Sequence, residues 1–119
     1  MANPLNNRVY GQVTIKNEHD NFRGDETLYI SVRDSLRHDA ECIELGSTTI
    51  QLRQGQRMPI NYQCTFDPNK AHMKFEQIKS IPGGITLSAS IERKDQLLYV
   101  NDTNLPLADE VDIQLVKVE

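Results

Sequence analysis

Apolar and polar residues alternate along most of this chain with the two-residue period of β-strands. In the first stretch, Val9, Val13 and Ile15 fall on one face, and polar side chains such as Gln12 and Thr14 fall on the other. The same rhythm returns in later stretches, which cover residues 27–33, 43–52, 58–66, 85–91 and 111–115. Because each stretch has one apolar and one polar face, each predicts a strand with one side in a core and the other in water.

Short polar turns separate the predicted strands, and no helices of comparable length alternate with them. This organisation is typical of antiparallel folds rather than of parallel strands joined by helices. The pattern predicts an all-β chain, namely a single-domain antiparallel β-sandwich of about seven or eight strands. One short helical or turn segment is expected near residues 68–79.

The segment near 68–79 carries the signals of a short helix. Asp67 precedes Pro68, so a carboxylate is available to accept free backbone amides while proline occupies the first helical position. Phe75 and Ile78 follow at helical spacing, and a Pro-Gly-Gly sequence then ends the segment. A set of turns is consistent with the same residues.

Three short features interrupt the strand rhythm. The apolar phase shifts across Gly46 and Ser47, which predicts either a β-bulge or a break between two strands. Pro59 has no backbone N–H to donate, so the strand that follows it is predicted to begin at a sheet edge. A tight turn is expected near Lys94 and Asp95.

The chain has 119 residues and a mass of 13.6 kDa, which is enough for one hydrophobic core. Charged residues make up 25% and hydrophobic residues 38%, a composition typical of globular rather than disordered proteins. We expect a flexible N-terminal segment at 1–7 and a single β-sandwich domain at 8–119.

The charge and aromatic content argue against nucleic acid as a partner. Thirteen basic and seventeen acidic residues give a net charge of −4, and the basic residues do not cluster. Binding to phosphates requires a concentrated positive face, and binding to single strands requires stacking aromatics, which make up only 6% here. No apolar run reaches the roughly 18 residues of a membrane-spanning helix.

Residues suited to catalysis or metal binding are sparse. His19, His38 and His72 each stand in a polar stretch, which favours solvated side chains over catalytic bases. Cys42 and Cys64 lack the close pair of ligands that marks a structural zinc site. We therefore expect no catalytic residues, no metal, no cofactor and no small-molecule substrate. The chain is predicted to act by binding and not as an enzyme.

Cys42 and Cys64 allow at most one internal disulfide. A bridge between them suits an exported protein, because disulfides persist in oxidising compartments. In the cytosol both would be buried thiols, and Cys64 lies in line with the apolar Tyr62 and Phe66. The sequence leaves both alternatives open.

Residues 97–100 depart from the alternation, because both faces of this stretch are apolar. One interpretation is that the predicted helical segment covers the second face through Phe75 and Ile78. The other is an exposed apolar strip that a partner protein covers. We take Leu97 and Tyr99, which the two-residue period places on one face, as candidate partner-binding residues.

Several short motifs follow one another in a fixed order over residues 8–103. They are Val9-x-Gly11-x-Val13, Leu28-x-Ile30-x-Val32-Arg33-Asp34-Ser35, Asp39-Ala40, Met58-Pro59-Ile60-x-Tyr62, Phe66-Asp67-Pro68, Ile85-x-Leu87-x-Ala89-x-Ile91-x-Arg93, Leu97-Leu98-Tyr99-Val100 and Asn101-Asp102-Thr103. This ordered set resembles the YscW-type pilotins of type III secretion systems and related small outer-membrane lipoproteins of Gram-negative bacteria.

The resemblance implies a β-sandwich lipoprotein at the periplasmic face of the outer membrane. Such pilotins bind the secretin subunit, here expected at its C-terminal region, and promote its outer-membrane targeting and ring assembly. The family anchors itself through a lipidated N-terminal cysteine, and this sequence has none near its start, since Cys42 is mid-chain. We therefore expect that a signal peptide and the lipidated cysteine have been removed, which leaves a soluble form.

Two other functions are compatible with the same predicted fold. One is a general cell-envelope lipoprotein with no secretion partner, and the other is a small enzyme or enzyme inhibitor on a sandwich scaffold. Fold alone does not distinguish among the three, because unrelated functions share common folds.

Overall fold

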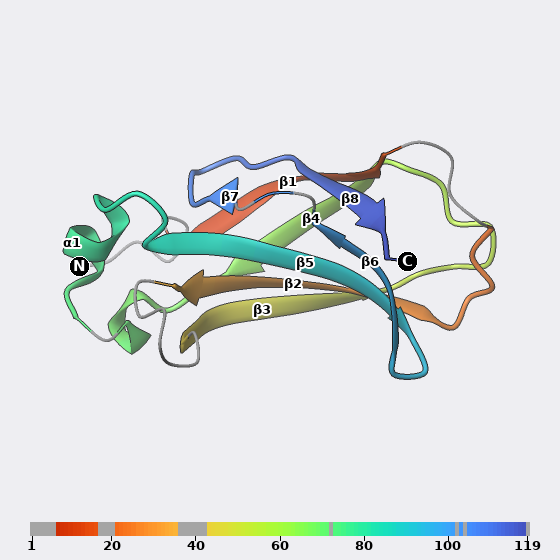
Figure 1. Cartoon of the computed structure of the whole chain (residues 1–119), viewed down its shortest axis with the longest axis horizontal. Helices are drawn as coiled ribbons and strands as arrows, with labels where there is room; N and C mark the ends of the chain where they lie inside the picture. The colour runs from red at the N-terminus through yellow and green to blue at the C-terminus, as the bar shows by residue number, and fades with distance from the viewer. Residues whose placement is uncertain are drawn as a thin grey trace.

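Most strands of this protein lie where the alternation predicts them, and Figure 1 shows their arrangement. The structure is a computed structural model and describes residues 7–16, 21–35, 43–71, 73–101, 103 and 105–118. Its strands are β1 (Arg8–Ile15), β2 (Glu26–Asp34), β3 (Ile43–Gln51), β4 (Ile60–Thr65), β5 (Ile85–Arg93), β6 (Gln96–Asn101), β7 (Leu105–Pro106) and β8 (Ile113–Lys117). A 3-10 turn, η2 (Pro68–Lys70), and a short helix, α1 (Phe75–Lys79), lie between β4 and β5.

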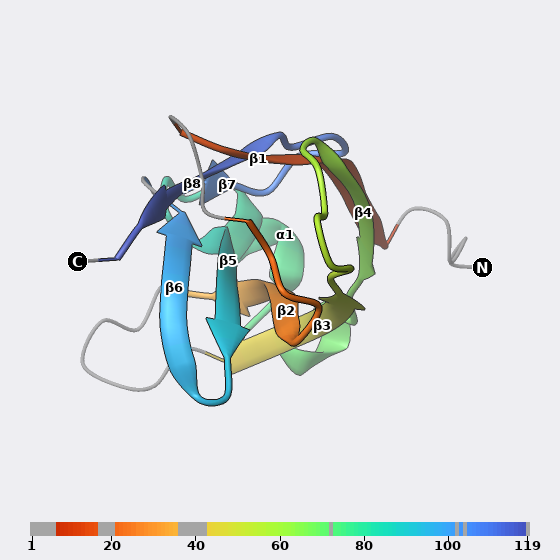
Figure 2. The same cartoon turned by 90° about the vertical axis from the view of Figure 1, so that its right-hand side faces the viewer.

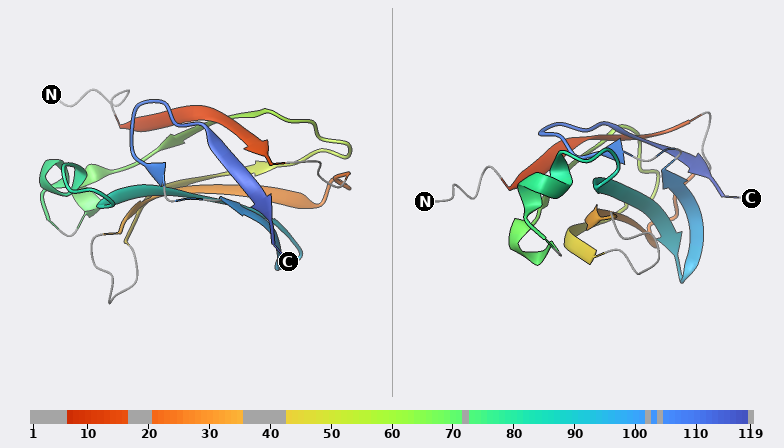
Figure 3. Two further views of the ribbon diagram at one scale, coloured as in Figure 1. Left: turned by 45° about the horizontal axis from the view of Figure 1, so that its top comes forward. Right: turned by 60° about the vertical axis from the view of Figure 1, so that its left-hand side comes forward.

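The strands described form one continuous sheet in the order β3-β2-β5-β6-β8-β1-β4, with β7 paired to β5. Neighbours are antiparallel except β1 and β8, which pair in parallel over three residues from Val13 to Ile15. The sheet curls until its two end strands, β3 and β4, approach each other (Figure 2). The predicted all-β fold with eight strands is thus confirmed, and the two layers of the sandwich are halves of a single curved sheet (Figure 3).

The core lies between the two halves of the sheet and is built from the apolar faces that the sequence pattern predicts. Val9 and Val13 of β1 are buried, as are their neighbours Tyr62 and Cys64 of β4. The other fully buried aliphatic side chains in the described part of the chain come from both halves of the sheet and from α1: Leu28, Ile30, Val32, Leu45, Leu52, Ile78, Leu87, Ile91, Ile113 and Leu115. Burial of one such side chain stabilises the fold by about 1.5–3 kcal/mol.

The phase shift at Gly46 is a bulge within one strand rather than a break between two. The pairing of β2 with β3 changes register after Val32, which faces Gly46. At Gly46 the backbone at the end of β4 comes so close that a Cβ would lie 2.1 Å from the carbonyl oxygen of Thr65. The amide of Asp67 then donates to the carbonyl of Leu45 at 2.9 Å, and this bond ties β3 to the end of β4.

Two other sequence predictions about local structure are confirmed. β4 begins at Ile60, directly after Pro59, and is one of the two end strands of the sheet. The hairpin between β5 and β6 turns at Lys94 and Asp95, which adopt φ values of 48° and 68°. Two successive positive φ values match the right-handed twist of the flanking strands.

The segment between β4 and β5 contains the predicted helical turns in two pieces. The carboxylate of Asp67 accepts the amide of Asn69 at 2.9 Å and so caps η2, as expected from the Asp-Pro sequence. In α1, Ile78 is completely buried. This segment lies at the end of the molecule opposite the β5–β6 hairpin (Figure 1), so it does not cover residues 97 and 98 as one interpretation of the sequence expected.

Candidate binding groove

An open groove of about 1030 Å³ lies at the α1 end of the molecule. One wall is the segment from Phe66 to Lys79, the floor is the start of β1, and the other wall is formed by residues 107–109. A groove of this size holds several side chains of a partner, and it lies at one edge of the sandwich where three elements meet.

Aromatic and sulfur-containing side chains make up the apolar part of the groove. Phe66 and Phe75 stack with their ring centroids 5.6 Å apart and their planes at 25°. Tyr10 and Met73 also line the groove, and each is 42% exposed. Together these side chains give part of the groove an apolar lining that suits contact with apolar side chains of a partner. Methionine in addition adapts its shape to a partner.

The ring of Tyr10 is held in position by its neighbours on β1 and β4. The guanidinium of Arg8 lies over the ring, 5.7 Å from the centroid, and donates to the side-chain oxygen of Gln63 at 3.0 Å. A cation over the face of a tyrosine ring is attracted to its π-electrons. Tyr10 is therefore an exposed aromatic side chain that loses little conformational freedom when a partner binds.

The backbone next to Tyr10 is already paired on both sides. Its amide donates to the carbonyl of Asp109 at 3.2 Å, and its carbonyl accepts the amide of Val111 at 2.9 Å. On the other edge, β1 pairs with β4 from Arg8 to Val13. Because no run of free backbone groups lies along the floor, a partner segment cannot add as a further strand there and must bind through side chains.

Residues 109–112, which continue the chain from the second wall, are fixed firmly against β1. Gly11 allows this approach, since a Cβ there would lie 2.1 Å from the carbonyl oxygen of Val111. The hydroxyl of Tyr62 donates to the same carbonyl at 2.6 Å, and burial raises the pKa of Tyr62. The carboxylate of Asp112 accepts the amide of Gln12 at 3.1 Å. The wall is therefore a rigid part of the fold.

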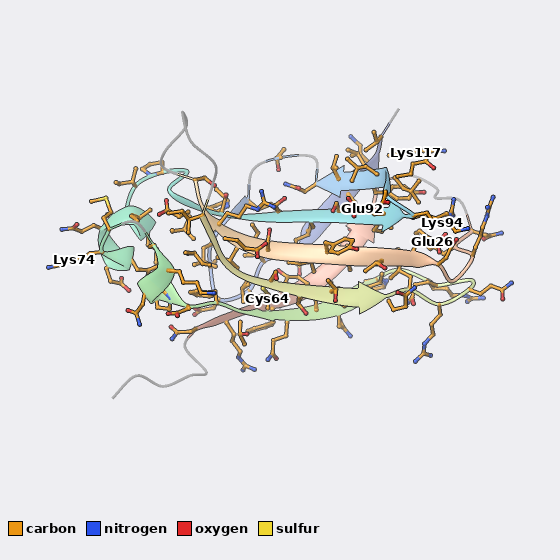
Figure 4. All side chains as sticks on the ribbon, turned by 90° about the horizontal axis from the view of Figure 1, so that it is seen from below. Glu26, Cys64, Lys74, Glu92, Lys94 and Lys117 are labelled. Carbon is orange, nitrogen blue, oxygen red and sulfur yellow. The ribbon has the colours of Figure 1, made fainter. Side chains whose placement is uncertain are left out.

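Charged side chains border the groove on both walls. Lys74, Glu76 and Lys79 line it from the α1 side, and Asp109 lines it from the opposite side. Figure 4 shows Lys74 at the outer end of the molecule, far from Glu26 and Lys94. Within the described part of the chain none of these four groove residues has an ion-pair partner, so their charges are available to a bound molecule.

The two predicted partner-binding residues do not share a face. Leu97 is 40% exposed, whereas Tyr99 is 3% exposed and packs edge-on against Phe22 with ring centroids 6.0 Å apart. The cause is a bulge in which Leu97 pairs with Glu92 and Tyr99 pairs with Ile91, so that no residue of β5 lies opposite Leu98. The extra residue shifts the alternation, which explains why apolar residues stand at successive positions of this stretch.

Leu97 borders a smaller cleft of about 230 Å³ beside the β5–β6 hairpin. Phe22, Leu98, Arg93 and Lys117 also line this cleft. Leu97 thus stays a surface candidate for partner binding, while Tyr99 belongs to the core. The expectation that Tyr99 is exposed is wrong. β6 contains a bulge that the sequence does not mark, and the two-residue period does not hold across it.

The structure gives Cys64 as a free, fully buried thiol. Its Sγ lies 3.6 Å from the carbonyl oxygen of Thr65, and burial raises its pKa to about 11. Cys42, the possible disulfide partner of Cys64, lies outside the described residues, as do His19, His38 and His72. Among the residues that are described, no three His, Cys, Asp or Glu side chains come together as a metal site.

Sequence reasoning missed the groove, although one signal for it was present. Tyr10 lies on the polar face of the first strand beside Gln12 and Thr14, where a large aromatic side chain has no core to enter. The other lining side chains, such as Phe66 and Met73, come from a loop and a strand end. Their convergence on Tyr10 depends on how the chain turns after β4, which periodicity does not specify.

This protein resembles solved structures in its fold rather than in its sequence. A solved structure described as an alternative pilotin from the type II secretion system of Vibrio cholerae matches with a TM-score of 0.72 and 17% sequence identity. The match covers 94% of this chain and 96% of that chain, so the two share one pilotin-like β fold over nearly their full lengths. At this level of identity the match establishes the fold alone.

A second solved structure, a 9R-lipoxygenase from Cyanothece PCC8801, matches at a TM-score of 0.46 and 14% identity. It covers 98% of this chain but only 17% of the lipoxygenase chain, and this likeness has no bearing on function. No family model and no curated protein matches the sequence. In the described part of the chain, no helix is long and apolar enough to cross a membrane.

Proposed function

We propose that this domain is a pilotin, which binds the secretin subunit of a bacterial secretion system and promotes its targeting to the outer membrane and its assembly into a ring. The observation that carries the proposal is the fold shared, end to end, with a protein described as a pilotin. The ordered motifs over residues 8–103, which resemble the YscW-type pilotins, support the same role independently.

The proposed binding site is the groove between α1 and residues 107–109. It offers what a pilotin requires of a binding surface, namely exposed aromatic anchors held on a rigid scaffold. Tyr10, Met73 and the stacked pair of Phe66 and Phe75 are the proposed contacts. We propose that the C-terminal region of the secretin docks there as a helix, since a helix satisfies its own backbone groups and the floor of the groove offers none.

The proposal extends to the cellular setting. The protein would be held at the periplasmic face of the outer membrane by an N-terminal lipid, with each buried CH₂ of the acyl chains contributing about 0.8 kcal/mol. The secretion system would be of type III, following the motif resemblance, although the fold neighbour is described with a type II system. The proposed role is binding alone, without a catalytic step or a cofactor.

The test is direct binding between the purified chain and purified C-terminal secretin fragments from the same organism, one from each candidate secretion system. We expect one fragment to bind with a dissociation constant in the micromolar range or below, measured by isothermal titration calorimetry. Deletion of the gene should then lower the amount of assembled secretin in the outer membrane. If neither fragment binds, the proposal is refuted. A general cell-envelope lipoprotein or a sandwich inhibitor of the same fold would then be favoured.

A further inference from the structure

We infer that the groove recognises charge as well as shape, and that it fits a helical segment with an apolar stripe, acidic residues along one flank and basic residues along the other. This inference rests on the proposed function, because it specifies the chemistry of the segment that binds there. It follows from the unequal charges of the two groove walls.

The α1 wall carries a net positive charge. Lys79 comes four residues after Phe75, so both side chains lie on one face of α1, and both line the groove. Lys74 directly precedes the helix and also lines the groove. Glu76 is the one acidic residue on this wall, and two lysines against one glutamate leave a charge of +1.

The opposite wall is negative. Asp109 lines the groove, and Glu110, which pairs with Tyr10, follows it on an exposed stretch. Neither carboxylate has an ion-pair partner among the described residues. Arg8, the remaining charged residue at the groove, keeps its charge, but it lies on the floor over Tyr10 and bonds to Gln63, so it belongs to neither wall and does not change the difference between them.

A segment with flanks of one sign would be attracted by one wall and repelled by the other. A segment with mixed flanks matches both walls, provided that its acidic flank lies beside α1. Turning a helix end for end exchanges its two flanks, so the charges of the walls also set the direction in which the helix lies. Arrangements of this kind give specificity and orientation more than affinity.

The test uses three synthetic amphipathic helices, each about five turns long and with one identical Leu and Ile stripe. The first peptide, called mixed, has one acidic and one basic flank. The second has two acidic flanks, and the third has two basic flanks. At low salt we expect the wild-type chain to bind the mixed peptide about fivefold more tightly than either uniform peptide, a preference that high salt should remove.

The decisive variant carries Lys74→Glu and Lys79→Glu, which makes both walls acidic. It should prefer the peptide with two basic flanks, whereas Lys70→Glu, a matched change on η2 outside the groove, should keep the wild-type order. An unchanged order in the double variant, while the secretin fragment still binds, overturns the charge inference and leaves the proposed function intact. Failure of all three peptides and of the secretin fragment to bind the wild-type chain overturns both.

Discussion

Glu26 and Arg93 form an ion pair that joins the start of β2 to the end of β5, and the Glu26 side chain is fully buried. Its carboxylate also accepts the amides of Arg23 and Gly24 at 2.9–3.0 Å. Arg93 in turn reaches Asp25 at 3.1 Å. Burial alone would raise the pKa of Glu26, but these hydrogen bonds and the guanidinium outweigh it and lower the pKa to about 2.

This pair makes stability depend on acid pH. In the folded chain the pKa of Glu26 is about 2, against an ordinary value of 4.5, so the unfolded chain takes up the proton first as the pH falls. The contribution of Glu26 is complete above pH 4.5 and is lost between pH 4.5 and pH 2. Glu26→Gln should lower the free energy of unfolding by about 3 kcal/mol at pH 7 and flatten its decline in that window.

Urea denaturation at pH 7 and at pH 3 measures both effects. Glu44→Gln, an exposed carboxylate on β3, is the matched control and should stay within about 0.5 kcal/mol of the wild type. Equal stabilities of the two variants at pH 7 would contradict the role assigned to the buried pair.

Leu97→Asp and Tyr99→Asp should behave differently, although the two residues are neighbours in the same apolar stretch. Tyr99 packs on Phe22 in the core, so Tyr99→Asp should cost at least about 3 kcal/mol of unfolding free energy. Leu97 is on the surface and its substitution should change stability by less than about 1 kcal/mol. Thermal unfolding followed by circular dichroism compares them, and similar losses in both would mean that Leu97 is also packed.

Tyr10→Ala should weaken binding of the secretin fragment about tenfold or more without altering the melting temperature by more than a few degrees. The reason is that its ring is exposed in the groove while its backbone pairing survives the substitution. Tyr29 is almost equally exposed, 41% against 42%, but lies on the outer face of β2, so Tyr29→Ala is the control. If calorimetry gave the same affinity for both variants, Tyr10 would not be part of the binding site.

Cys64 should react slowly with thiol reagents in the folded chain. Its side chain is fully buried and its pKa is raised to about 11, so at pH 8 little thiolate is present and access is blocked. In a Cys42→Ser background, labelling by iodoacetamide followed by mass spectrometry should be at least about a hundredfold slower in buffer than in denaturant. Rapid labelling in buffer would show that β4 opens readily.

Most strands were predictable because they have one buried face, and a two-residue period follows directly from that arrangement; β6 departs from the period, and the two-residue β7 is too short to show one. The Asp67–Pro68 cap and the turn at Lys94 and Asp95 were predictable for a different reason, since each depends on residues adjacent in sequence. What periodicity could not reveal was the bulge at Leu98, which adds one residue to β6 and places Leu97 and Tyr99 on opposite faces.

The groove depends on contacts between residues far apart in the chain. Tyr10, Phe75 and Asp109 converge because β1 pairs with β4 on one side and with residues 109–111 on the other. Nothing local to any of the three indicates the other two. The parallel pairing of β1 and β8 was equally beyond the sequence pattern, since strands far apart in the chain can pair in either direction.

The position of β8 between β6 and β1 has a consequence for how the sheet closes. β8 joins the two halves of the sheet, because it pairs with β6 on one edge and with β1 on the other. While residues 113–117 are unpaired, β1 and β6 each lack a neighbour and the halves have no backbone connection through that seam. Closure of the sheet therefore requires a segment about a hundred residues from β1 to insert between two strands, which is pairing of the slow, non-local kind.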